Sequence, residues 1–226
     1  EGLSRRGVAV LRYDKRTFVC PQFFENAKEG YTYDDETVDD AISAVRLVKD
    51  SLAKEKTIDP SRIYIVGHSM GGMLAPRIAE RSGEVAGLVL LAAPTGKLRP
   101  TMERQLAYLG RSAEEARQLT DLALAEIPEV YLDMDARYSD TATAQSLNLP
   151  MLILQGERDY QVTMDDYRAW REALGNRQGV VMKSYPSLNH LFMSGEGASM
   201  PEEYRTPGHV AEEVMDDIAN FVLSGK

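Results

Sequence analysis

Short apolar runs alternate with amphipathic segments along this chain of 226 residues. Such runs are typical of buried strands, and we expect strands at 8–13, 63–66, 85–91, 151–155 and 180–185. Apolar residues recur at helical spacing in other segments, which predicts helices over 38–52, 73–81 and 209–223. Strands that alternate with amphipathic helices predict an α/β fold, in which helices cover both faces of a mostly parallel sheet.

The segment 96–149 departs from this alternation because it contains no convincing strand. Apolar spacing predicts one helix over 98–109 and another over 119–127. We therefore interpret this segment as a helical cap that is inserted between two strands. The expected organisation is a first part of the core at 1–95, the cap at 96–149 and a second part of the core at 150–226.

Composition narrows the classes of partner. The chain carries 35 acidic and 26 basic residues, so its net charge is −9. Nucleic-acid-binding proteins normally present a basic surface, and this balance argues against a nucleic-acid partner. The sequence also has no run of about 18 apolar residues, so we expect no membrane insertion.

The clearest motif is Gly67-His68-Ser69-Met70-Gly71, which fits G-x-S-x-G between a predicted strand and a predicted helix. A sharp turn at this point exposes the serine hydroxyl, and the glycines leave room for the tight backbone. The backbone N–H of Met70 would then lie at a helix N-terminus, where it suits an oxyanion. The motif predicts that Ser69 is a nucleophile; the alternative is a simple glycine-rich turn.

A serine nucleophile needs a base, and the sequence has three histidines. His190 follows the predicted strand 180–185, and catalytic groups of parallel sheets come from loops at the carboxyl ends of strands. His68 is adjacent to the serine and should have a structural role. His209 opens the last predicted helix and is interpreted as a helix terminus. His190 is therefore the predicted base.

The acid of the triad should also follow a strand. Asp159 lies four residues after the predicted strand 151–155, and Glu157 is its nearest rival. Asp165 and Asp166 look like acids in the first turn of a helix, where they interact favourably with the helix dipole. The resulting order of Ser69, Asp159 and His190 is the order of the α/β-hydrolase triad.

Several long stretches carry a resemblance to the α/β-hydrolase superfamily, and more narrowly to bacterial serine esterases of the EstD-like group. They are GVAVLRYDKRT, IYIVGHSMGGMLAPRIA, LVLLAAP, LILQGERDYQVTMDD, YPSLNHLFMSGEG and RTPGHVAEEVMDDIANF. The resemblance implies an α/β-hydrolase sheet with Ser69 as nucleophile, His190 as base and Asp159 as the acid that orients it. It also implies a carboxylesterase that acts on a small-molecule ester and needs no metal or cofactor.

The resemblance further implies early strands, and a loop with a second oxyanion donor, that do not precede Val8 in this sequence. In that fold a strand separates 8–13 from 63–66, and its removal would leave a gap of roughly 10 Å, since neighbouring strands lie about 4.8 Å apart. We therefore expect the chain to be part of a longer protein, whose N-terminal segment or a partner chain fills the gap. The first residues do not indicate a localisation.

Alternatives to the esterase remain open at this point. The same fold carries peptidases and thioesterases, and it also occurs in binding modules without catalytic activity. In the predicted cap, Tyr131, Met134 and Tyr138 could line an acyl pocket. Apolar residues at that spacing are at least as often the core of the cap itself.

Overall fold

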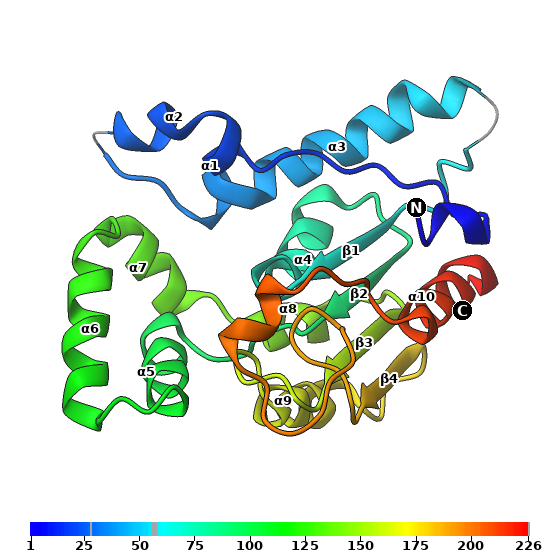
Figure 1. Cartoon of the computed structure of the whole chain (residues 1–226). Coiled ribbons are helices and arrows are strands. Elements are labelled where there is room, and N and C mark those ends of the chain that lie inside the picture. The colour runs from blue at the N-terminus through cyan, green and yellow to red at the C-terminus, as the bar shows by residue number, and fades with distance from the viewer. Residues whose placement is uncertain (28, 56–57, 226) are drawn as a thin grey trace.

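The computed structural model describes residues 1–27, 29–55 and 58–225. In these residues the sheet has four parallel strands in the order β1-β2-β3-β4 (Figure 1). The strands are β1 (Tyr64–His68), β2 (Gly87–Leu91), β3 (Met151–Gly156) and β4 (Val180–Tyr185). The sequence therefore predicted the parallel α/β architecture and the position of these four strands correctly.

Helices connect the strands and follow the last of them. The α-helices are α1 (Arg16–Val19), α2 (Pro21–Glu25), α3 (Asp39–Asp50), α4 (Met70–Ser82), α5 (Leu98–Tyr108), α6 (Ala113–Ala125), α7 (Glu129–Arg137), α8 (Asp140–Ser146), α9 (Met164–Leu174) and α10 (Glu212–Ser224). Shorter helical turns are Ser4–Arg6, Asp34–Val38, Leu52–Glu55 and Pro201–Arg205. Each described helix is too short or too polar to cross a lipid bilayer.

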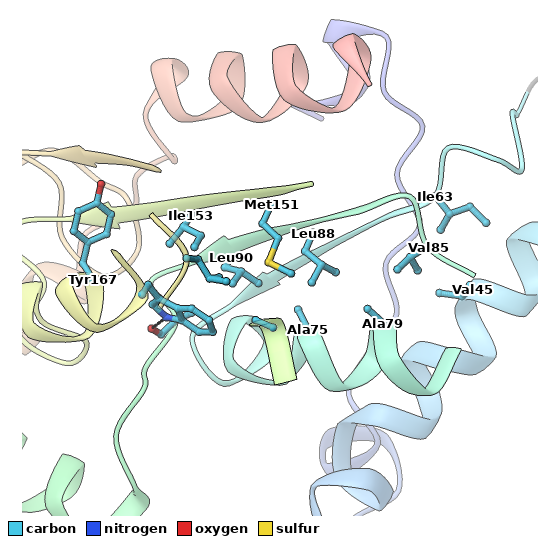
Figure 2. Packing of buried hydrophobic residues seen from close by; sticks show 14 residues of the cluster. Val45, Ile63, Ala75, Ala79, Val85, Leu88, Leu90, Met151, Ile153 and Tyr167 are labelled. Carbon is cyan, nitrogen blue, oxygen red and sulfur yellow. Dashed lines mark hydrogen bonds between the residues drawn. The ribbon is translucent and has the colours of Figure 1, made fainter. Parts of the chain in front are cut away.

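Successive strand residues point to opposite faces of the sheet, and each face has its own core. Leu88, Leu90, Met151 and Ile153 pack with residues of α3, α4, α8 and α9 on one face. Val89, Leu152 and Leu154 pack on the other face with residues of α10. Figure 2 shows the first face, where Ala75 and Ala79 of α4 approach Leu88 and Leu90. Both faces are thus covered by helices, as the sequence predicted.

The prediction of a buried strand at 8–13 was wrong. The structure has no strand there; the segment is a coil between the Ser4–Arg6 turn and α1, and Val10, Leu11 and Tyr13 are exposed (Figure 1). A strand needs a neighbour to pair its backbone groups. The edge strand β1 is paired with β2 alone among the described strands, and 8–13 makes no ladder with it.

The segment 96–149 is helical, and its described structure consists of α5 to α8 and connecting loops. In Figure 1, α5, α6 and α7 lie together on one side of the molecule, opposite α10. In contrast, α8 contacts α4 and α9, and its Ala144 lies in the core on the face of the sheet that α4 covers. The helix expected over 98–109 is α5, and the helix expected over 119–127 overlaps the second half of α6, whereas α7 and α8 were not predicted. The division of the chain into a core and a functional cap stays a prediction.

Candidate active site

Ser69 lies at the corner between β1 and α4. Strand β1 ends at His68 and α4 begins at Met70, so the serine is the only residue between them. Its φ of 54° is unusual for a residue with a side chain and marks a strained turn. Its backbone N–H donates to Leu91 O at 2.8 Å, and its carbonyl accepts from Gly72 N and Met73 N. The corner is therefore fixed by both the neighbouring strand and the helix that follows.

The glycines at this corner, Gly67 and Gly71 of the motif and the following Gly72, differ in what the packing requires of them. A Cβ atom on Gly67 would lie 2.2 Å from the backbone oxygen of Gly71, which is far too close. A Cβ atom on Gly72 would lie 2.9 Å from Cβ of Ala93, at the contact of α4 with the end of β2. A Cβ atom on Gly71 would meet no atom within 4 Å. Gly67 and Gly72 are thus the glycines on which close strand–helix packing depends.

Asp159 and His190 come together in the space beyond the ends of β3 and β4. His190 Nδ1 and Asp159 Oδ2 are 2.7 Å apart, and both side chains are buried. This hydrogen bond leaves the Nε2 edge of the imidazole available for another partner. Among the described residues, no hydrogen bond joins His190 to the hydroxyl of Ser69, a contact that is often loose in structures without substrate.

Asp159 is held rigidly by its own loop. Its Oδ1 accepts the backbone N–H groups of Gln161 at 2.8 Å and Val162 at 3.0 Å. Its Oδ2 accepts from His190 and also lies 3.3 Å from Nε2 of Gln155. Donors on both oxygens stabilise a carboxylate and fix its direction. The carboxylate therefore points at His190 in one defined orientation.

Gln155 is a site residue that our sequence analysis missed. It is buried at the end of β3, where Nε2 also lies 2.9 Å from Val162 O and 3.0 Å from Gly156 O. The amide thus ties the strand end to the loop that carries Asp159. The signal was present in the sequence, since Gln155 is the one polar residue in the otherwise apolar run MLILQ.

His68 contacts His190 and not the serine hydroxyl. Its Nε2 lies 2.8 Å from the backbone oxygen of His190, and the two ring centroids are 4.6 Å apart. Protein atoms displace water from around the ring, which disfavours its charged form, and the nearby His190 adds to this effect. The pKa of His68 therefore lies below its usual value. A neutral His68 donates from Nε2 to this carbonyl and holds the His190 loop against the corner.

The helix N-terminus beside Ser69 can bind a negatively charged group. The backbone N–H groups of Met70 and Gly71 have no hydrogen-bond partner among the described residues. Both N–H groups belong to the first turn of the 13-residue helix α4. The first N–H groups of a helix attract anions because of their direction and the helix dipole.

The rival residues occupy other environments. His209 is exposed. Glu157 is also exposed and accepts a hydrogen bond from the hydroxyl of Ser184. Asp165 pairs with Arg168 in the first turn of α9, and Asp166 accepts the backbone N–H of Thr163 at 2.9 Å as part of the cap of that helix. His190 and Asp159 are thus the histidine and the acid that meet.

The three cap residues lie near α4. Tyr131 is buried, and its hydroxyl donates to Glu36 Oε2 at 2.7 Å and lies 3.7 Å from Sδ of Met70. Tyr138 donates to the backbone oxygen of Met73 at 3.0 Å. Met134 packs against an apolar cluster that includes Tyr131 and, from α4, Met73 and Leu74. These contacts join α7 to the nucleophile corner, and Tyr131 touches the residue that follows the serine.

The described residues contain no group of three or more His, Cys, Asp or Glu side chains that could hold a metal ion. The site combines a serine on a strained corner, a buried histidine–carboxylate pair and free N–H groups at a helix N-terminus. This arrangement is suited to nucleophilic attack on a carbonyl with stabilisation of the resulting oxyanion.

Comparison with known proteins places the chain in a family. The model of the prolyl oligopeptidase family matches residues 22–214. Esterase EstD of Thermotoga maritima is 39% identical over 237 aligned positions, which cover 98% of this chain and 55% of that protein. The chain thus spans about half the length of the curated relative that it matches.

Solved structures of esterases share the fold. An esterase from Pyrococcus furiosus is 18% identical with a TM-score of 0.64, and the match covers 99% of this chain and 72% of that chain. An esterase from Pyrobaculum calidifontis is 21% identical with a TM-score of 0.57, and the match covers 86% of this chain and 62% of that chain.

Proposed function

Since the chain belongs to the prolyl oligopeptidase family and has the α/β-hydrolase fold, we propose that it carries the catalytic machinery of a serine carboxylesterase. The observation that carries this proposal is the 2.7 Å contact of buried His190 with Asp159, since both residues, like Ser69, follow the carboxyl ends of the parallel strands. The 39% identity with Esterase EstD favours an ester as the substrate.

In the proposed reaction, Nε2 of His190 takes the proton of the Ser69 hydroxyl, and the serine oxygen attacks the ester carbonyl. The backbone N–H of Met70 donates to the oxyanion that forms. The imidazolium of His190 then protonates the leaving alkoxide oxygen as its bond to the carbonyl carbon breaks, so that the alcohol departs and the acyl group stays on Ser69. Water activated by His190 releases the acid, while Asp159 keeps the imidazole oriented and stabilises its positive charge.

Turnover of matched substrates tests this proposal. A second candidate is a peptidase, favoured by the name of the matching family, and a thioesterase would use the same chemistry. We expect hydrolysis of p-nitrophenyl acetate and butyrate at rates far above those of an aminoacyl p-nitroanilide and an acyl thioester. Faster cleavage of the anilide would assign the site to a peptidase, and faster cleavage of the thioester to a thioesterase.

We also propose that a further strand, from the same protein or a partner chain, pairs with the free edge of β1. Val66, the central residue of this strand, is 44% exposed although its side chain is apolar. An edge strand presents a row of unpaired backbone groups, which proteins normally cover or protect. A strand at this edge would lie beside Ser69 and could bring the second donor of the oxyanion hole.

Hydrogen exchange measured on the active protein tests the pairing. The amides of β1 that do not bond to β2 should exchange as slowly as those that do, because a second neighbour would protect them. Rapid exchange at those amides, in a protein that hydrolyses esters, would contradict the added strand.

The contacts of α7 with α4 support a role of the cap in substrate choice. We propose that Tyr131, Met134 and Tyr138 line the acyl side of the site. Exchange of Met134 for alanine should then change kcat/KM for an octanoate ester several-fold more than for an acetate ester, since a pocket residue contacts only the longer chain. Equal losses on both esters would assign these side chains to the core of the cap.

A further inference from the structure

The two loops that carry Asp159 and His190 lie side by side. The backbone N–H of Arg158 donates to Leu188 O at 3.0 Å, and a Cβ atom on Gly156 would lie 2.5 Å from the same oxygen. Each key residue is preceded by a polar one: Arg158 stands before Asp159, and Asn189 before His190. The side chains of these two preceding residues meet at one acceptor.

That acceptor is the carboxylate of Glu203, which lies on the helical turn Pro201–Arg205. Its Oε1 is 2.5 Å from Nη2 of Arg158, and its Oε2 accepts from Nδ2 of Asn189 at 2.9 Å. The hydroxyl of Ser199, which is fully buried, also donates to Oε2 at 3.2 Å. One carboxylate thus binds a donor from the Asp159 loop and a donor from the His190 loop.

Both donors are held in place by further contacts. The Arg158 side chain is 8% exposed and also donates to the backbone oxygens of Gly197 at 2.8 Å and Glu196 at 2.9 Å. Asn189 is buried, and its Oδ1 accepts the backbone N–H groups of Leu191 and Met193. Asn189 therefore links Glu203 to the backbone of the His190 loop, and Arg158 links the Asp159 loop to the segment 196–203.

Gly195 lies directly against the guanidinium of Arg158. A Cβ atom there would lie 2.1 Å from Nη1 of Arg158.

The same hydrogen bonds favour the charged form of the Glu203 carboxylate. Partial burial alone would raise the pKa of Glu203, but the hydrogen bonds from Arg158 and Asn189 outweigh it and hold the pKa below its usual value.

We propose that Glu203 is a positioning residue, which clamps the Asp159 loop to the His190 loop and thereby sets the geometry of the Asp159–His190 hydrogen bond. The inference rests on the proposed function in assigning catalysis to this pair. Asp159 is fixed within its own loop and His190 is tied to the corner through His68, so the relative position of the two loops is what a clamp between them controls. A small displacement of such a pair reduces catalysis strongly.

The test compares Glu203→Gln, which keeps the size and removes the charge, with Glu203→Asp, which keeps the charge. The control is Glu202→Gln on the same turn, because Glu202 is exposed and has no hydrogen-bond partner among the described side chains. Three quantities are measured in the intact protein: the melting temperature, kcat and KM for p-nitrophenyl acetate, and the far-downfield proton resonance of an imidazole N–H bonded to a carboxylate.

We expect Glu203→Gln to lower kcat by roughly 10- to 100-fold with little change in KM, while the protein stays folded at the assay temperature. The downfield resonance should weaken or vanish in Glu203→Gln, return in part in Glu203→Asp and stay unchanged in Glu202→Gln. A Glu203→Gln variant that only melts at a lower temperature, with kcat and the resonance unchanged, would overturn the proposal.

The resonance also separates this proposal from the esterase assignment, because it does not depend on turnover. If the wild-type protein hydrolyses no ester and the resonance is still lost in Glu203→Gln, the esterase assignment fails and the clamp stands. If the wild-type protein is an esterase and the resonance survives in Glu203→Gln with full kcat, the clamp fails and the esterase assignment stands.

Discussion

Ser69→Ala and His190→Ala should each lower kcat for ester hydrolysis by about 10⁴- to 10⁶-fold, and the double variant should be no worse than the poorer single one. The reason is that the nucleophile and its base act as a unit, so removal of either one removes the acyl-enzyme route. Steady-state rates with p-nitrophenyl butyrate measure the effect.

The matched control for the base is His209→Ala, since His209 is exposed and has no place in the proposed reaction. Its rate should equal that of the wild type. A His190→Ala variant that keeps near-normal kcat, or a His209→Ala variant that loses it, would show that the base is assigned to the wrong histidine.

Gly67→Ala should destabilise the protein by roughly 3 kcal/mol or more, because its Cβ would collide with backbone at 2.2 Å and nothing flexible can move aside. In a domain of this size that corresponds to a fall in melting temperature of about 6–12 °C. The control is Gly71→Ala, whose Cβ meets no atom within 4 Å and whose effect should stay within about 1 kcal/mol.

Thermal unfolding followed by circular dichroism compares these two variants directly. The two glycines occupy equivalent places in the G-x-S-x-G pattern, so the pattern alone predicts equal effects. The geometry predicts a large effect at Gly67 and a small one at Gly71. Equal melting temperatures for the two variants would contradict the packing that we describe for the corner.

The parts of the fold that the sequence predicts well are those in which one segment determines its own structure. The run 151–154 is apolar throughout and forms most of β3, and the spacing of Val214, Ile218 and Phe221 places α10 on the sheet. The strand expected at 8–13 failed for the opposite reason. An apolar run becomes a strand only where a neighbour accepts its backbone groups, and none of the described strands pairs with it.

The residues of the candidate site also fall into those that the sequence predicts and those that it does not. Ser69, Asp159 and His190 can be selected from the sequence because each follows a strand of a parallel sheet, and such ends meet at one edge. Gln155 and Glu203 escaped this reasoning. The contacts of Glu203 join residues 14 and 45 positions away in the chain, and periodicity carries no information about such pairs.

The measurement that tests the central claim most directly is covalent labelling with a fluorophosphonate probe, followed by mass spectrometry of the modified peptide. Such probes react with serines that are activated by a base, whether or not the natural ester is known. We predict a single stoichiometric adduct on Ser69, formed in the wild-type protein and much more slowly in His190→Ala. A folded wild-type protein that gives no adduct on Ser69, or that is labelled at another residue, would contradict the account of this site as a serine hydrolase.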